Sequence, residues 1–370
     1  MPSFAEDVAF LKDHVETIVL TNDAGASIAV VPAFQGRVMT SAADTEGPGN
    51  GWINHELIAS RAPQPHIMPF GGEERLWLGP EGGQFSIFFE PGVPFDFEHW
   101  QTPAFIDTEP FQVVEATESK VVLEREVKFV NYSGTRFHIR LDRTIELLAP
   151  SKEIQSVAYR SDNSITNIGN DAWTKEGGLL SLWVLSMLKH SPTTTVIAPI
   201  QRGPESSHGP RVNAAYFGQV PPDRLKVGET HVLFRADGQV RSKIGLSPSR
   251  ATPTLGSFDP GRGLLTVAEF TIEPGVTDYV NSMWEWQDHP YAGDVSNSYN
   301  DGPPTEGAKP LGPFYELESS SPAFALQPGD TGRHIHSTSH YTGEIDHLQV
   351  IADSKLAFNL SDLTKSDLWF

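Results

Sequence analysis

The chain has 370 residues, with 47 Asp and Glu against 27 Lys and Arg, and a formal net charge of -20 at neutral pH. Nucleic acid and anionic membrane are therefore not expected partners, because both carry negative phosphates. A hydrophobic fraction of 38% suffices for a packed core. No stretch approaches the ~20 apolar residues of a membrane helix.

Cysteine is absent, so the redox compartment stays open. The first twenty residues carry acids early and lack the apolar run of a secretory signal. We therefore expect no signal peptide in the chain as given. A cytoplasmic protein and the mature form of an exported one both fit this expectation.

The N-terminal segment shows the best helical periodicity. Its apolar residues Phe4, Val8, Leu11 and Val15 recur at helical spacing and predict a helix over residues 5–16. Two short apolar runs, 16–21 and 26–32, follow on either side of a turn signal and predict an opening hairpin.

Residues 66–92 form a dense segment with glycine pairs at 71–72 and 82–83, where the backbone turns sharply or packs closely. Acids, an arginine and a tryptophan between the pairs are typical of sugar sites, because an indole stacks on a pyranose while charged groups bind its hydroxyls. A structural hairpin rim is the alternative. The residues expected to bind sugar here are His66, Arg75, Trp77 and Glu81.

Residues 111–160 alternate strictly between apolar and polar side chains, which predicts a meander of long antiparallel strands with one buried face. Arg143 falls on the apolar face, so we expect it to form a buried ion pair rather than to act in catalysis. Residues 179–187 are almost continuously apolar and predict a central strand.

Further strands are predicted over 230–235, 240–246, 264–272 and 279–286, and residues 341–370 read as alternating pieces with a polar end. Residues Trp284 and Trp286 add aromatic platforms for a sugar. The whole chain carries roughly fifteen to twenty short strands and few helices. We therefore expect residues 1–370 to form a single domain, one large antiparallel sandwich.

A pair of strands near the C-terminus organises the functional interpretation. Glu316 and Glu318 share one face of a strand over 314–319, since side chains two residues apart lie on the same face. His334, His336 and His340 share one face of a later strand. If these strands are neighbours, carboxylates and imidazoles meet, which suits proton transfer near neutral pH.

A metal on this second strand is a weaker interpretation. His336 and His340 lie ~13 Å apart along an extended strand, too far to share one ion. Only His334 and His336, with a ligand from elsewhere, remain as candidate ligands. We expect no metal and no other cofactor.

The C-terminal segment resembles the aldose 1-epimerases. Its run of Tyr315–Ser319, Pro322, Leu326, the Pro328-Gly329 turn and a final strand is similar to theirs. The resemblance implies the galactose mutarotase-like fold, an all-β, large antiparallel β-supersandwich with few short helices. More narrowly, the chain resembles a bacterial family of this fold whose function is not characterised.

The resemblance also implies a role for one glutamate. Glu318 matches the catalytic base of the epimerases, with Glu316 in its place if the register shifts by two. The segment at Phe70 resembles their His-Gly-Gly stretch, but Phe70 stands where they have a histidine. The second family histidine has no counterpart near residues 182–184.

The implied function is that of a carbohydrate-active protein that binds a sugar or oligosaccharide in a cleft of the sandwich. Glu318, with Glu316 or His336, would exchange protons with the sugar in an epimerase. A lyase that uses Arg75 or Arg143 to neutralise a uronate, and a two-carboxylate hydrolase, stay open. The alternative classes are a non-catalytic glycan-binding module with Trp77, Trp284 and Trp286 as platforms, and a structural protein without a sugar ligand.

Overall fold

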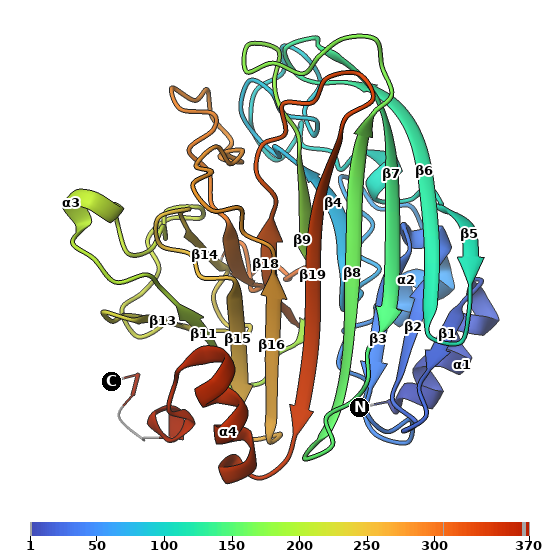
Figure 1. Cartoon of the computed structure of the whole chain (residues 1–370), viewed down its shortest axis with the longest axis vertical. Coiled ribbons are helices and arrows are strands. Elements are labelled where there is room, and N and C mark those ends of the chain that lie inside the picture. Colours follow the sequence, from blue (N-terminus) through green and yellow to red (C-terminus); the bar gives the residue numbers. More distant parts are fainter. Residues whose placement is uncertain (1, 306, 365–367, 370) are drawn as a thin grey trace.

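The computed structural model describes residues 2–305, 307–364 and 368–369. Antiparallel strands dominate it, and two large sheets pack face to face (Figure 1). The predicted antiparallel β-supersandwich is confirmed. The strand alternation that predicted it is seen directly, since long strands such as Arg136–Leu147 bury every second side chain.

The larger sheet has ten strands in the order β12-β13-β11-β15-β16-β19-β8-β7-β6-β5. The meander predicted over 111–160 forms one side of it, and β19 pairs with β8 along its whole length. The strands are β5 (Gln112–Ala116), β6 (Lys120–Val130), β7 (Arg136–Leu147), β8 (Gln155–Asn167), β11 (Thr195–Pro199), β12 (Leu225–Val227), β13 (His231–Arg235), β15 (Thr254–Asp259), β16 (Leu264–Phe270) and β19 (Thr331–Thr342).

The smaller sheet runs β14-β17-β18-β9-β4, with β10 also paired to β18. The apolar segment 179–187 supplies β9, an interior strand of this sheet, and the strand with the two glutamates is β18. Its strands are β4 (Arg75–Gly79), β9 (Ser181–Leu185), β10 (Leu188–Lys189), β14 (Ser242–Leu246), β17 (Ser296–Asn300) and β18 (Phe314–Ser320).

A three-stranded sheet and two helices pack at the N-terminal side. The helix predicted over 5–16 is α1 (Phe4–His14), which starts one residue earlier because Ser3 and Glu6 form a capping box. Its apolar face packs on the sheet with α2 (His55–Ser60). The sheet consists of β1 (Ile18–Thr21), β2 (Ser27–Val31) and β3 (Arg37–Ala42).

Two predictions from sequence were wrong. Residues 345–356 form helix α4 (Ile345–Leu356), which packs Leu348, Ala352 and Leu356 on the outer face of β11, β15 and β16. The segment 279–286 is not a strand but a loop held by one bridge between Tyr279 and Ala292. Its apolar residues cover the smaller sheet and do not pair with a neighbouring strand within it.

The remaining helical turns are short. They are α3 (Glu205–His208), η1 (Pro32–Phe34), η2 (Ala104–Ile106) and η3 (Leu360–Thr364). Within the described residues, no helix has the length and apolar character needed to cross a membrane.

The core between the two large sheets contains a buried ion pair of an arginine with a glutamate. Arg143 on β7 donates to Glu74 at 2.8 Å and to Asn163 at 2.7 Å, and its side chain is fully buried. The predicted structural role of Arg143 is thus confirmed. Burial lowers the pKa of Arg143 and raises that of Glu74, while the partner charge opposes each shift.

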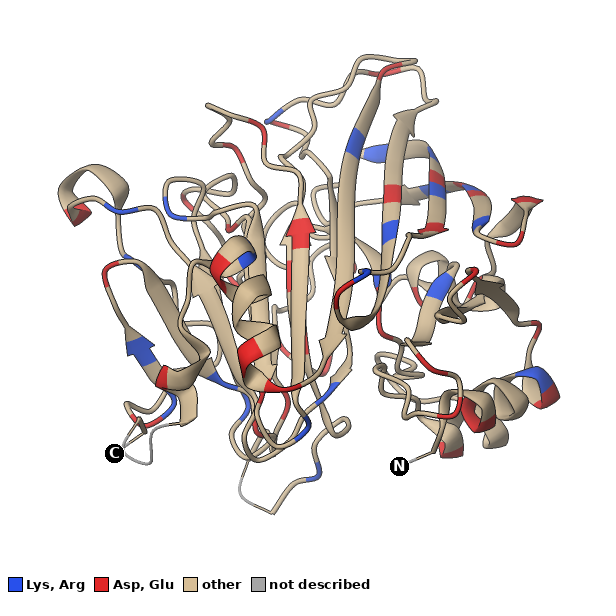
Figure 2. Cartoon of the chain, turned by 60° about the horizontal axis from the view of Figure 1, so that its bottom comes forward, with Lys and Arg blue, Asp and Glu red and all other residues tan. Residues whose placement is uncertain are grey.

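Charged residues are interspersed on the exposed strands of the larger sheet, where acidic and basic side chains alternate (Figure 2). Arg140 pairs with Asp142 on β7, and Arg160 on β8 pairs with Glu146. Such exposed pairs contribute little stability, ~0–1 kcal/mol each.

Candidate functional site

The outer face of the smaller sheet carries the polar residues that the sequence singled out. Glu316 and Glu318 alternate with the inward Leu317 on β18, so the prediction that they share a face is confirmed. Strand register places Trp77 opposite Trp183 and Glu318 opposite Asn297. Paired residues project to the same side of a sheet, so these side chains gather on one face.

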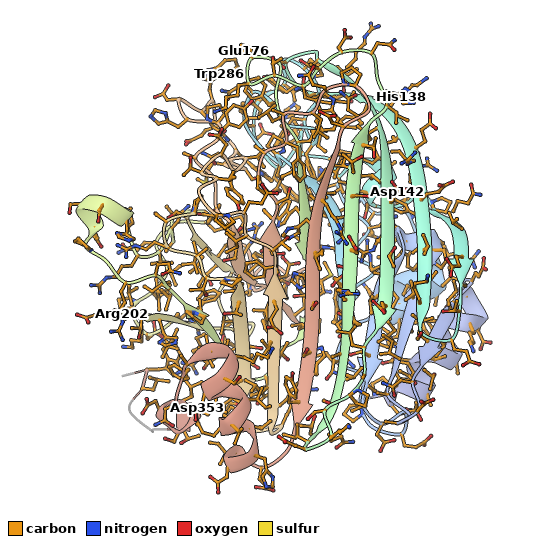
Figure 3. The ribbon with its side chains drawn as sticks, in the orientation of Figure 1. His138, Asp142, Glu176, Arg202, Trp286 and Asp353 are labelled. Atoms are coloured by element: carbon orange, nitrogen blue, oxygen red, sulfur yellow. The ribbon has the colours of Figure 1, made fainter. Side chains whose placement is uncertain are left out.

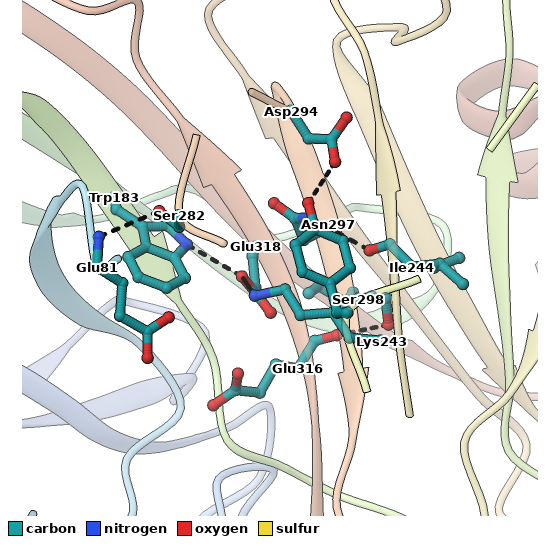
Figure 4. A network of polar contacts seen from close by, with 12 residues as sticks. Glu81, Trp183, Lys243, Ile244, Ser282, Asp294, Asn297, Ser298, Glu316 and Glu318 are labelled. Atoms are coloured by element: carbon teal, nitrogen blue, oxygen red, sulfur yellow. Dashed lines mark hydrogen bonds and ion pairs between the residues drawn. The ribbon is translucent and has the colours of Figure 1, made fainter. Parts of the chain in front are cut away.

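Glu318 is the best-buried acid on this face. Its Oε2 accepts hydrogen bonds from Trp183 Nε1 at 3.0 Å and from Lys243 Nζ at 2.8 Å, and the side chain is fully buried (Figure 4). Its Oε1 has no hydrogen-bond partner among the described residues. A buried carboxylate oxygen without a partner is costly unless a ligand or water satisfies it.

The Lys243 ammonium lies between aromatic rings above this carboxylate. Its Nζ is 4.9 Å from the ring centre of Trp183 and 5.4 Å from that of Tyr216. Cation–π contacts and the Glu318 charge both stabilise the ammonium there. Lys243 therefore caps Glu318 in this conformation.

Glu316 forms the second ion pair of the face. Arg75 donates to it at 2.7 Å, and the Arg75 guanidinium stacks on Trp77 at 4.4 Å. Burial raises the pKa of Glu316 to about 8, with Arg75 opposing the shift and the Glu318 charge adding to it. The two glutamates thus have different partners, one a guanidinium and the other an ammonium.

A small, partly enclosed cavity lies beside Lys243 and Trp183. Its volume is about 20 Å³, room for one water and far less than a pyranose needs. Tyr216 closes one side, since its hydroxyl donates to Asp294 and accepts from Asn297 at 3.0 Å. The other lining residues are Gly79, Ser181, Val280, Ser282 and Ser320.

The loop after β4 covers the face from the opposite side. Glu81 N–H donates to Ser282 Oγ at 3.2 Å, and Ser86 Oγ donates to the Glu81 carbonyl. Gly82 lies against the backbone of Met283, where a Cβ would come within 2.4 Å of its carbonyl oxygen. The predicted close approach at this glycine pair is therefore real, and it fixes Glu81 over the face.

None of the four predicted sugar-binding residues Trp77, Trp284, Trp286 and His66 lines this cavity. Trp77 stacks on Arg75, the partner of Glu316. Trp284 hydrogen-bonds the Glu81 carboxylate and stacks on Trp100. Trp286 is 71% exposed and lies at the same end of the molecule as Glu176 (Figure 3). His66 Nδ1 bonds the carbonyl of Trp100 at 2.7 Å.

The structure separates the histidines from the two glutamates, which corrects the predicted meeting of carboxylates and imidazoles. His336 lies on β19 in the larger sheet, and its Nδ1 is 2.8 Å from Ser319 Oγ. Ser319 projects from the face of β18 opposite to that of Glu318. His336 therefore lies between the sheets and cannot share a substrate with Glu318.

His334 and His336, the two candidate metal ligands, form hydrogen bonds to other side chains. Ser319 Oγ lies 2.8 Å from His334 Nε2 as well, and His334 Nδ1 bonds Thr271. His340 bonds Glu73 at 2.7 Å. No group of three or more His, Asp or Glu side chains in the described part of the chain is placed to hold a metal.

Burial of His334 and His336 predicts a pH dependence of stability. It lowers the pKa of His336 to about 3, so below pH ~6.5 the unfolded chain binds a proton that the folded chain does not. Each such histidine then lowers the free energy of unfolding by ~1.4 kcal/mol per pH unit between pH ~6.5 and ~3. The raised pKa of Glu316 acts with the opposite sign, because its folded form binds the extra proton.

The contribution of His336 to this pH dependence is therefore measured as a difference between the wild type and a variant. We expect His336→Asn, which keeps a polar atom near Ser319, to reduce the slope of unfolding free energy against pH between pH 4.5 and 6.5 by ~1.4 kcal/mol per unit. Urea titrations at several pH values measure both slopes. Equal slopes in the two proteins would show that His336 protonates alike in the folded and unfolded states.

Sequence reasoning missed several residues of this face. Lys243 sits in a short strand, and Tyr216 and Asp294 lie in loops that no sequence pattern connects to β18. Trp183 lies in the segment 182–184, where the sequence indicates only the lack of the second family histidine. A lysine within a mostly apolar strand was the one available signal, since such a charge needs a buried partner.

Fold and site together define a class: a galactose mutarotase-like β-supersandwich with two ion-paired glutamates on the outer face of its smaller sheet. The chain belongs to a family of unknown function, DUF6786, whose sequence profile matches residues 2–367. No curated protein sequence matches it.

Solved structures of low sequence identity share the fold. A proposed aldose 1-epimerase of Escherichia coli K12 has a TM-score of 0.54 at 14% identity, over 89% of this chain and 99% of that one. A galactose mutarotase-like protein of Lactobacillus casei has a TM-score of 0.52 at 11% identity, over 88% and 100%. A proposed aldose 1-epimerase of Klebsiella pneumoniae has a TM-score of 0.51 at 9% identity, over 90% and 80%.

Proposed function

We propose that the protein binds a neutral aldose on the outer face of the smaller sheet and interconverts its anomers, with Glu318 as the base. The unpartnered Oε1 of buried Glu318 carries this proposal. A sugar hydroxyl is a donor that satisfies such an oxygen, and general-base transfer needs the same contact. The mutarotase-like names of the structural neighbours support a sugar as the ligand.

The other enzyme classes have weaker support. A lyase needs a free cation for the uronate, but Arg143 is buried between the sheets and Arg75 is engaged by Glu316. A hydrolase needs carboxylates flanking the glycosidic bond, whereas Glu316 and Glu318 come from one face of one strand. The site has more acids than cations, and this negative charge disfavours anionic sugars. The cations are Arg75 and Lys243, and the acids are Glu81, Asp294, Glu316 and Glu318.

Binding requires the cover of the face to move. The cavity of about 20 Å³ is too small for a pyranose, so the segment with Tyr216 must open. Its neighbour Phe217 is 44% exposed, and Tyr216 is the residue of this segment that joins Asp294 and Asn297. Loops that cover a site in this way commonly gate entry.

Anomer exchange tests the proposal directly. Magnetisation-transfer NMR on equilibrated galactose, glucose and related aldoses should show interconversion that rises in proportion to protein concentration. Saturation-transfer NMR on the same samples reports binding. Binding without exchange would favour the alternative, a glycan-binding module that uses Trp77 and Trp284. If no neutral aldose shows binding or exchange, both the epimerase proposal and the glycan-binding alternative are overturned.

A further inference from the structure

The proposed site has a base in Glu318 but lacks the imidazole that the spacing of the histidines on their strand led us to expect. His336 lies behind the sheet, and none of the residues that line the cavity in the described chain is a histidine. Opening a pyranose ring needs a proton donor at the ring oxygen as well as a base at the C1 hydroxyl. A second group on this face or in its cover must therefore supply that proton in the proposed reaction.

Glu316 is poorly placed for this task. It shares a strand and a face with Glu318, and Arg75 holds it at 2.7 Å. The C1 hydroxyl and the ring oxygen lie on different sides of C1, so base and acid should approach from different elements. Only the covering loops offer such a second direction.

Glu81 comes from the covering loop. Figure 4 shows its side chain extending past Trp183 in the direction of the carboxylates of Glu316 and Glu318. Its backbone is fixed by Ser282 and Ser86, which sets the point from which the side chain extends. The charges of Lys243 and Glu318 act on its pKa in opposite directions.

We infer that Glu81 is the proton donor that acts together with Glu318, an assignment that rests on the proposed epimerisation. Glu318 takes the proton of the C1 hydroxyl, and the bond from C1 to the ring oxygen breaks as the carbonyl forms. The Glu81 carboxylic acid gives its proton to the ring oxygen. Closure on the other face of the aldehyde reverses both transfers and restores each group.

The environment of Glu81 suits this role near neutral pH. Burial raises its pKa to about 7, with Lys243 opposing the shift and the Glu318 charge adding to it. The Trp284 hydrogen bond lowers the pKa. A donor with a pKa close to the working pH combines a sizeable protonated fraction with easy transfer.

Glu81→Gln tests the inference in the intact chain. We expect kcat for galactose anomer exchange to fall by about a hundredfold or more, with KM little changed. The activity of the wild type should decline above pH ~7, and this decline should be absent in the residual activity of the variant. Glu285→Gln, an exposed acid of the neighbouring loop, is the matched control and should leave the rate and the pH profile unchanged.

Trp284→Phe provides a second readout if Glu81→Gln folds poorly. Loss of the indole donor removes a hydrogen bond that lowers the Glu81 pKa, so the decline in activity should move to higher pH. A Glu81→Gln protein with the wild-type rate and an unmoved pH profile would overturn the assignment alone. A wild-type protein that binds aldoses without exchange would overturn the proposed epimerisation, and this inference with it.

Discussion

Glu318→Gln is expected to lower the rate of anomer interconversion by about a hundredfold to ten-thousandfold, the usual contribution of a general base. Glutamine keeps the shape of the side chain and an acceptor for Trp183 Nε1 but cannot take up a proton. Sugar binding should remain detectable, because the aromatic residues and Arg75 are unchanged. Magnetisation-transfer NMR measures the rate, and saturation-transfer NMR measures binding.

The variant also leaves Lys243 without its counter-charge, so its fold must be checked. Glu269→Gln is the matched control, because Glu269 is also ion-paired to a lysine, Lys355 at 2.9 Å, but on the larger sheet. Thermal unfolding of both variants separates a loss of catalysis from a loss of structure. A folded Glu318→Gln protein with wild-type exchange would refute Glu318 as the base.

Arg143→Met should be strongly destabilising, with a loss of ~3–5 kcal/mol in the free energy of unfolding. The variant leaves the Glu74 carboxylate buried without its cation, and Asn163 loses a donor. A loss of this size is a large fraction of the ~5–15 kcal/mol that stabilises a typical protein. Urea unfolding monitored by tryptophan fluorescence measures it.

A neighbouring pair gives the control. Arg140 lies on the same strand but is exposed, and it pairs with Asp142 at 3.0 Å; Arg140→Met should cost at most ~1 kcal/mol. The double variant Arg143→Met with Glu74→Gln should recover part of the loss, because no unpaired charge then remains. Equal effects of Arg143→Met and Arg140→Met would contradict a structural role for the buried pair.

Local patterns in the sequence were reliable where one face of an element decides its environment. The alternation of residues 120–147 correctly predicted β6 and β7, and it placed Arg143 on the buried face. The same period of two put Glu316 and Glu318 on one side of β18. These conclusions needed no partner strand, since alternation follows from strand geometry alone.

The same reasoning failed for residues 279–286 and 345–356. Aromatic and apolar residues in the first segment looked like a strand, but they cover the smaller sheet as a loop. In the second, apolar residues at helical spacing pack on the outer face of the larger sheet. Packing against a neighbouring element decided both, and no local pattern reports that neighbour.

The sequence by itself determined the all-β class, the shared face of the two glutamates and the burial of Arg143, because side-chain period and composition act within one strand. Only the tertiary structure decided which elements meet. It brought Lys243, Trp183 and Glu81 to Glu318 and put His336 behind the sheet. Contacts between segments more than fifty residues apart depend on strand order, which the periodicity of a single strand does not encode.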